Sequence, residues 1–248
     1  MRALSEILPT EQPPDPAHRR QRLVLLPGLD GTNKRYTEFI RSLGCAAQVE
    51  VIAYPCDEPL GYDQLEVLVR ASLPLGQRYF LLGESFSGPL AIRIAANPPD
   101  GLVGLILCGT FAKNPLPWLH WARPLAVRAP IKTLPRWLRA LLLWGSIEPQ
   151  RAPAHADRSI AGVAAAVVRH RIGEIFDVDE SRRLGCIDLP MLILRARGDF
   201  IVPRAATRWM LKSAKGAQLA EIDGPHLLLQ SRPDDCAAAV LQFLERWI

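Results

Sequence analysis

Residues 79–92, YFLLGESFSGPLAI, carry the strongest structural signal in the sequence. Its first four residues form an apolar run typical of a buried strand, and the residues from Pro89 onward have the composition of a buried helix. A turn of small residues lies between them, with Ser85 at its tip. Pro89 fits the first helical turn, where its missing N–H costs no hydrogen bond. The stretch therefore predicts a strand, a sharp turn that presents Ser85, and a helix.

Ser85 at such a turn has the setting that a nucleophile requires. A serine hydroxyl attacks a carbonyl carbon only when a base takes its proton and the approach to its oxygen is open. A strand-to-helix turn leaves that approach open, and it aims the N–H groups of the helix N-terminus at a developing oxyanion. The small residues Gly83, Ser87 and Gly88 indicate that the strand and helix backbones approach closely here.

Short apolar strands alternate with helices on both sides of this stretch. The expected strands cover residues 22–26, 49–54, 79–82, 102–108, 190–196 and 217–222. The expected helices cover about residues 33–43, 62–73, 89–97, 204–213 and 234–247. Strands that are buried on both faces and separated by helices predict an α/β fold with a doubly wound, mostly parallel sheet.

Composition narrows the class of protein. A chain of 248 residues with 49% hydrophobic content can bury one large core. The net charge of +5 is spread along the chain without dense basic runs, which argues against nucleic acid as a partner. No apolar stretch approaches about 18 residues, so we expect no transmembrane segment. The five cysteines form no C-x-x-C pair and the N-terminus lacks a signal peptide, so we expect a cytoplasmic protein.

The turn also carries a family resemblance. Gly83-x-Ser85-x-Ser87 resembles the G-x-S-x-G nucleophile motif of α/β-hydrolases, with serine in place of the last glycine. The similarity extends over about residues 22–110 and 185–248. It implies the α/β-hydrolase fold, with Ser85 as the nucleophile of a serine hydrolase. Taken alone, the motif also fits a strand–helix junction capped by Ser85 or Ser87.

The resemblance assigns an oxyanion hole to two backbone amides. The turn Pro27-Gly28-Leu29-Asp30-Gly31-Thr32 follows the first strand, at the sheet edge where α/β folds bind ligands. In α/β-hydrolases this turn and the residue after the nucleophile each provide one N–H group, which implies Leu29 and Phe86 here. The family often begins this turn with His-Gly, whereas this chain has Pro27-Gly28. An ordinary glycine-rich turn is the alternative interpretation.

The resemblance also supplies an acid and a base. Asp199 follows the strand at 190–196, where the family carries the carboxylate that orients the catalytic histidine. His226 lies on the loop after the last strand, where the family carries the base. The order Ser85, Asp199, His226 is the order found in α/β-hydrolases. Read without the resemblance, Asp199 fits a turn-forming Gly-Asp pair and His226 a structural histidine. This chemistry requires no cofactor and no metal.

Residues 111–184, which we call the cap segment, interrupt the alternation. The resemblance implies a helical lid inserted after the strand at 102–108, between two halves of the core at 22–110 and 185–248. The prolines and the missing apolar periodicity at 1–21 predict an extended arm there, in place of the two antiparallel strands that the family usually carries. Trp118, Trp137 and Trp144 are expected to bind an apolar acyl group, although they could instead pack the cap onto the core. The six charged residues at 111–147 are all basic. They could bind coenzyme A, an acidic acyl carrier protein or an anionic membrane surface, or they could simply form a solvated face.

These observations predict a serine hydrolase, either a carboxylesterase or a thioesterase, that cleaves a small acyl ester or thioester through an acyl-enzyme. Two alternatives stay open. An acyltransferase differs only in whether water or another acceptor reaches the acyl-enzyme, and a ligand-binding or receptor protein could keep the same residues with little turnover.

Overall fold

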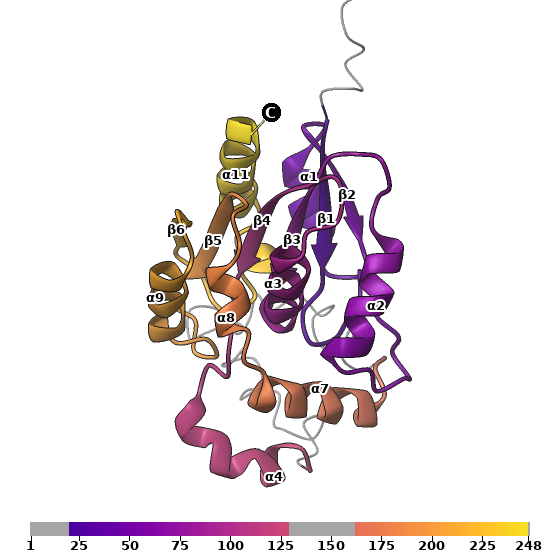
Figure 1. Ribbon diagram of the computed structural model, residues 1–248, viewed down its shortest axis with the longest axis vertical. Coiled ribbons are helices and arrows are strands. Elements are labelled where there is room, and N and C mark those ends of the chain that lie inside the picture. The colour runs from indigo at the N-terminus through magenta and orange to yellow at the C-terminus, as the bar shows by residue number, and fades with distance from the viewer. Residues whose placement is uncertain (1–19, 129–161, 248) are drawn as a thin grey trace, which may run out of the picture.

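The computed structural model describes residues 20–128 and 162–247 (Figure 1). Six strands form one sheet in the order β2-β1-β3-β4-β5-β6, and every neighbouring pair is parallel. The predicted doubly wound parallel sheet is therefore confirmed. The strands are β1 (Gln21–Leu26), β2 (Ala47–Val51), β3 (Tyr79–Glu84), β4 (Leu102–Cys108), β5 (Met191–Ala196) and β6 (Gln218–Ile222).

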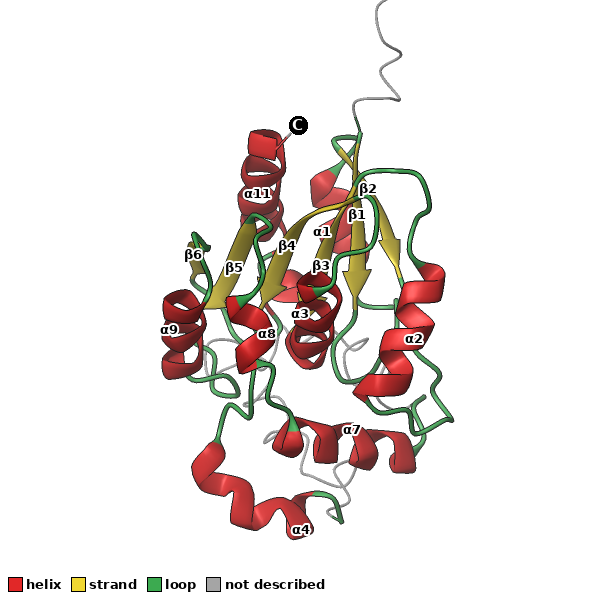
Figure 2. Cartoon of the chain, viewed as in Figure 1, coloured by secondary structure: helices red, strands yellow, loops and turns green. Residues whose placement is uncertain are grey.

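Helices cover both faces of this sheet (Figure 2). Side chains alternate along β1, so that Val24 and Leu26 enter one core while Leu23 and Leu25 enter the other. The first core lies under α2 (Tyr62–Ser72), α3 (Gly88–Ala96), α8 (Ser181–Gly185) and α9 (Arg204–Ser213). The second core lies under α1 (Thr37–Leu43) and α11 (Pro233–Leu244). A short helix, α10 (Leu228–Ser231), precedes α11.

Most helix boundaries follow the sequence pattern. Two differences occur at ends. The helix expected from residue 33 begins at Thr37, because Arg35 and Tyr36 turn their side chains inward to buried carboxylates. The helix expected to reach residue 247 ends at Leu244 and continues as the 3₁₀ turn η5 (Glu245–Trp247).

Most of the described cap segment lies beyond the carboxyl ends of the strands, whereas its last residues, 181–184, belong to α8 on the face of the sheet (Figure 1). They contain the 3₁₀ helix η3 (Pro117–Ala122), α4 (Arg123–Ala126) and α7 (Ala165–Asp177). An exposed ion pair between Arg123 and Asp177 joins α4 to α7. Helix α7 begins at Ala165, because Ala164 has extended backbone angles. No described helix is long and apolar enough to cross a membrane.

Parts of the predicted domain division lie outside the described residues. Of the arm expected at 1–21, only Arg20 and Gln21 are described, and Gln21 already belongs to β1. Trp137 and Trp144 also fall outside the described residues. The division into arm, core and cap therefore stays a prediction.

The turn between β3 and α3 depends on close backbone contact. A Cβ atom added at Gly83 would lie 2.7 Å from the Ser87 carbonyl oxygen and 2.8 Å from Ala91 Cβ. Both distances are shorter than atoms tolerate, so the strand and helix meet at this spacing only with glycine at position 83. This contact aims Ser85, in the 3₁₀ turn η2 (Ser85–Ser87), at the edge of the sheet.

We predict that Gly83→Ala lowers the free energy of unfolding by about 2 kcal/mol, because backbone must move to admit the methyl group. Gly185→Ala is the matched control, since its added Cβ would meet only the Ser213 carbonyl oxygen at an ordinary 3.8 Å. Urea unfolding monitored by circular dichroism measures both variants. Equal stability of Gly83→Ala and the wild-type protein would contradict the packing described here.

Candidate active site

Ser85 occupies a strained backbone position. Its φ angle is 50°, and no other non-glycine residue in the described part of the chain has a positive φ. Such strain persists only where the surrounding structure enforces it, and it occurs often at functional sites. The Thr110 hydroxyl at the end of β4 donates a hydrogen bond to the Ser85 carbonyl oxygen and so supports the turn.

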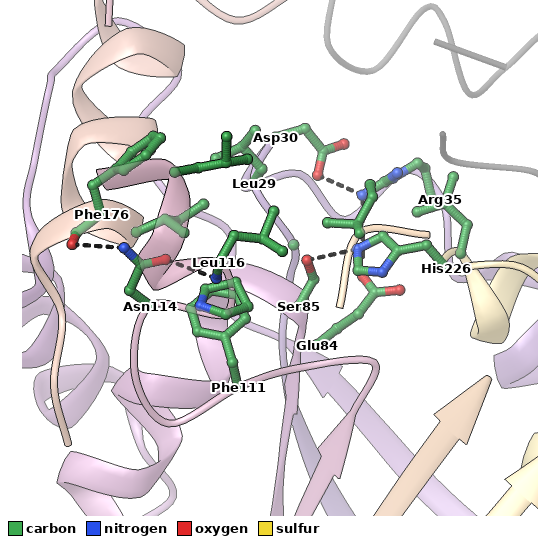
Figure 3. A pocket seen from close by; sticks show the side chains of 16 residues that line it. Leu29, Asp30, Arg35, Glu84, Ser85, Phe111, Asn114, Leu116, Phe176 and His226 are labelled. Atoms are coloured by element: carbon green, nitrogen blue, oxygen red, sulfur yellow. Dashed lines mark hydrogen bonds and ion pairs between the residues drawn. The ribbon is translucent and has the colours of Figure 1, made fainter. Parts of the chain in front are cut away.

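The structure brings Ser85, His226 and Asp199 together, as the sequence predicts. Ser85 Oγ lies 2.9 Å from His226 Nε2 (Figure 3), and His226 Nδ1 lies 2.9 Å from Asp199 Oδ2. Both partners of the second contact are almost entirely buried, with side chains 3% and 2% exposed. The hydroxyl, the imidazole and the carboxylate therefore form one continuous hydrogen-bonded chain.

Backbone groups hold Asp199 in place. Its Oδ1 atom accepts hydrogen bonds from the N–H groups of Ile201 and Val202, each at 2.8 Å. These bonds leave Oδ2 to face His226. On the other side, Gly109 has a φ of 52° and makes room for the histidine, because an added Cβ would lie 3.3 Å from the His226 carbonyl oxygen. The imidazole is thus fixed with Nε2 toward Ser85.

The two predicted oxyanion donors lie in well-ordered turns. In the turn after β1, Gly31 N–H donates to the Gly28 carbonyl oxygen at 2.9 Å, and Gly28 N–H donates to the Tyr36 hydroxyl at 3.2 Å. The Leu29 N–H between them has no acceptor among the described residues. Phe86 is the second residue of η2, where backbone N–H groups lack a partner within the helix. Both N–H groups are therefore available to an anion.

Ser87, which replaces the last glycine of the motif, has a structural use. It is fully buried, its Oγ lies 2.6 Å from the Tyr54 hydroxyl, and it donates to the Pro27 carbonyl oxygen. The hydroxyl thereby ties the nucleophile turn to the oxyanion turn. Burial raises the pKa of Tyr54, so this phenol stays protonated and donates to Ser87.

A buried polar network lies beside the nucleophile. Glu84 accepts hydrogen bonds from the Tyr36 hydroxyl and, at 2.9 Å, from Gln230 Nε2. Arg35 Nη2 lies 2.9 Å from Asp30 Oδ1 and 4.0 Å from Glu84 Oε2. Burial and then the Glu84 carboxylate raise the pKa of Tyr36 well above its ordinary value. Sequence reasoning missed this network; the only available signal was a charged residue, Glu84, at the end of an apolar strand.

A cavity of about 220 Å³ opens above Ser85 and His226. One wall carries the charged side chains of Asp30, Arg35 and Glu84, and the other is mainly apolar (Figure 3). The apolar wall comes largely from the cap segment and includes Phe111, Leu116, Leu119, Ile175 and Phe176. Ser85 thus lies between a charged wall and an apolar wall, and the apolar wall suits an acyl group.

The structure does not bring the predicted Trp118 into this cavity. Its side chain is 70% exposed and is absent from the cavity wall, whereas Leu116 and Leu119 of the same segment line it. A 3₁₀ helix has three residues per turn, so positions 116 and 119 share a face that position 118 does not. The described residues contain no cluster of side chains suited to a metal ion.

We predict that Glu84→Leu lowers the free energy of unfolding by about 3 kcal/mol, because the Tyr36 hydroxyl and Gln230 amide lose their buried acceptor. Glu84→Gln keeps the shape and should cost less. Glu66→Gln is the control, because Glu66 forms a surface pair with Arg70 and its loss should cost no more than about 0.5 kcal/mol. Urea unfolding measures all three, and similar values for Glu84→Leu and Glu66→Gln would refute the network's importance.

Known proteins resemble this chain in sequence and in structure. A 26% identical relative from Aromatoleum aromaticum, a pimeloyl-[acyl-carrier protein] methyl ester esterase, aligns over 89% of this chain and 97% of its own length. RutD of Rhizobium rhizogenes, whose name assigns it provisionally to carbamate hydrolysis, is 27% identical over 73% of this chain and 71% of its own. The enol-lactonase of Burkholderia xenovorans LB400 shares the fold, with a TM-score of 0.80 at 18% identity and 91% and 92% of the two chains covered. The sequence model of the alpha/beta hydrolase family matches residues 23–239, and the chain therefore belongs to the alpha/beta hydrolase family.

Proposed function

We propose that this protein is a serine hydrolase that cleaves a carboxylic ester or thioester through an acyl-enzyme. The observation that carries the proposal is the hydrogen-bonded chain from Ser85 Oγ through His226 to Asp199, with 2.9 Å at each step. This chain of hydrogen bonds begins at Ser85, the only non-glycine residue with a positive φ in the described structure. Membership of a hydrolase family supports the same conclusion independently.

In the proposed mechanism, Ser85 Oγ attacks the substrate carbonyl carbon while His226 Nε2 takes the hydroxyl proton. Asp199 holds the imidazole tautomer that can accept this proton and stabilises the imidazolium that forms. The Leu29 and Phe86 N–H groups bind the oxyanion, and two such donors are worth about 3 kcal/mol each in the transition state. His226 then protonates the leaving group, and a water molecule, activated by the same histidine, releases the acid.

The apolar cavity wall and the relatives guide the choice of substrate. Phe111, Leu116 and Phe176 suit an acyl chain rather than a charged acyl group. The Aromatoleum relative is named for a methyl ester carried on acyl carrier protein. We therefore propose an acyl ester or thioester, with an acidic acyl carrier protein or coenzyme A as the candidate carrier for the basic cap. All five cysteines are free, which supports a reducing, cytoplasmic location.

We predict that a fluorophosphonate probe labels Ser85 and that Ser85→Ala abolishes the labelling. Ser85→Ala and His226→Ala should each lower kcat about 10⁴- to 10⁶-fold, and the double variant should lose little more, because the residues act as a unit. Esterase assays and mass spectrometry of the labelled peptide provide the measurements.

Ser72→Ala is the control for these variants, since Ser72 lies exposed on α2 and bonds only the Leu68 carbonyl oxygen. It should leave both labelling and activity unchanged. Absence of labelling in the wild-type protein would favour a binding protein over an enzyme. Additive losses in the double variant would contradict the shared mechanism.

Phe176→Ala tests the assignment of the acyl wall. Removing this ring deepens the apolar part of the cavity, so kcat/KM for long p-nitrophenyl esters should rise about tenfold relative to the acetate. Trp118→Ala is the matched control, and because Trp118 faces away from the cavity its chain-length profile should match the wild-type one within about twofold. A shift in Trp118→Ala alone would place the acyl site elsewhere.

A panel of p-nitrophenyl esters and acyl thioesters, assayed with and without added alcohols and amines, separates hydrolysis from acyl transfer. Hydrolysis releases only free acid. An acyltransferase would convert most of the acyl group into a new ester or amide at millimolar acceptor.

A further inference from the structure

Helix α7 of the cap carries an arginine that reaches into the core. The Arg171 side chain is fully buried. Its Nη1 donates to the Leu29 carbonyl oxygen and its Nη2 to the Pro55 carbonyl oxygen, each at 2.9 Å. The guanidinium carbon also lies 5.5 Å from the centre of the Tyr54 ring and 6.0 Å from that of the Phe86 ring. Arg171 therefore bridges the cap, the oxyanion turn and the loop after β2.

This arginine is costly to bury. No carboxylate of the described residues forms an ion pair with it, and its Nε has no hydrogen-bond partner. Burial lowers its pKa, which reflects the loss of hydration. A buried charge without a counterion is a poor source of stability. The guanidinium instead fixes the positions of two backbone carbonyls relative to each other, because its planar group donates to both at once.

The carbonyl that Arg171 holds belongs to a predicted oxyanion donor. The Leu29 N–H shares a peptide plane with the Gly28 carbonyl, which accepts the Gly31 N–H, and Arg171 holds the Leu29 carbonyl of the next peptide plane. Both peptide planes that meet at the Leu29 Cα are therefore restrained. Gly31 makes the approach of Arg171 feasible. Its φ is +69°, and an added Cβ would lie 2.6 Å from Arg171 Nη1.

The same helix supports the second donor and the cavity wall. Glu174, one turn after Arg171, accepts the Tyr62 N–H at 2.8 Å. The Tyr62 hydroxyl donates to the Phe86 carbonyl oxygen at 2.8 Å, and the Tyr62 and Phe86 rings stack with centroids 4.8 Å apart. The next two residues of α7, at 175 and 176, line the acyl cavity. Helix α7 thus contacts the oxyanion turn and the acyl cavity directly, and it is linked to the Phe86 backbone through Tyr62.

We propose that Arg171 is a positioning residue that holds the Leu29 amide in the geometry that binds the oxyanion, and that it thereby couples the cap to catalysis. The proposal rests on the proposed function. An acyl group packed against α7 stabilises the helix that supplies Arg171, so occupancy of the acyl wall and alignment of the oxyanion hole reinforce each other.

The test replaces Arg171 by Met, which keeps most of the volume and removes both hydrogen bonds. With p-nitrophenyl acetate, kcat should fall about 10- to 100-fold while KM changes less than about threefold, because the loss falls on the transition state. The rate of fluorophosphonate labelling and the affinity for an alkylboronic acid, whose adduct on Ser85 places an oxygen in the oxyanion hole, should fall in proportion to kcat/KM. Arg123→Met is the matched control, since Arg123 pairs with Asp177 on the surface of the cap.

Arg171→Lys serves as a second variant in case Arg171→Met does not fold. A lysine keeps the charge but cannot hold two carbonyls in a fork, so it should show the same loss of kcat. Wild-type kcat and boronic acid affinity in either folded variant would overturn the proposal, as would a loss of kcat with boronic acid affinity unchanged. Labelling of the wild-type protein establishes Ser85 as the nucleophile first, so failure of this inference is distinct from failure of the proposed function.

Discussion

The close contact between β3 and α3 is the constraint on which the site depends. Gly83 lets the strand approach Ser87 and Ala91, and the turn that closes this contact forces Ser85 into its positive φ. Since β3 lies between β1 and β4 in a parallel sheet, the loops that leave all three strands emerge at the same edge. The order of the strands therefore places the oxyanion turn and Thr110 next to Ser85. The sheet alone sets their relative positions.

The buried charges around the nucleophile follow from the same crowding. Glu84 precedes Ser85 and is buried on the charged side of the cavity. Its carboxylate therefore depends on buried donors for its hydrogen bonds. Tyr36 and Gln230 provide these bonds, and Arg35 adds a charge shared with Asp30. Arg35 Nε and Gln230 Oε1 have no hydrogen-bond partner among the described residues, so the network is only partly satisfied. The result is a largely buried polar wall beside Ser85.

Local signals explain which features could be predicted from sequence. The strands are apolar runs bounded by turn residues, and Asp199 and His226 follow strand ends, so their order along the chain together with the family resemblance groups them with Ser85. The contacts of Glu84 with Gln230 and of Arg171 with Leu29 join residues 146 and 142 positions apart and leave no periodic trace. The residue type of Trp118 predicts a place in the acyl site, but Trp118 lies on the face of its 3₁₀ helix that points outward.

The oxyanion turn is held from three directions. Ser87 at the nucleophile turn donates to the Pro27 carbonyl oxygen, Tyr36 accepts from the Gly28 N–H, and Arg171 of the cap donates to the Leu29 carbonyl oxygen. The first two contacts lie within the core. Only the third comes from the segment that also lines the acyl cavity. Under the proposed mechanism, a substrate that packs against this wall contacts the same helix, α7, that carries the Arg171 support of the Leu29 carbonyl oxygen.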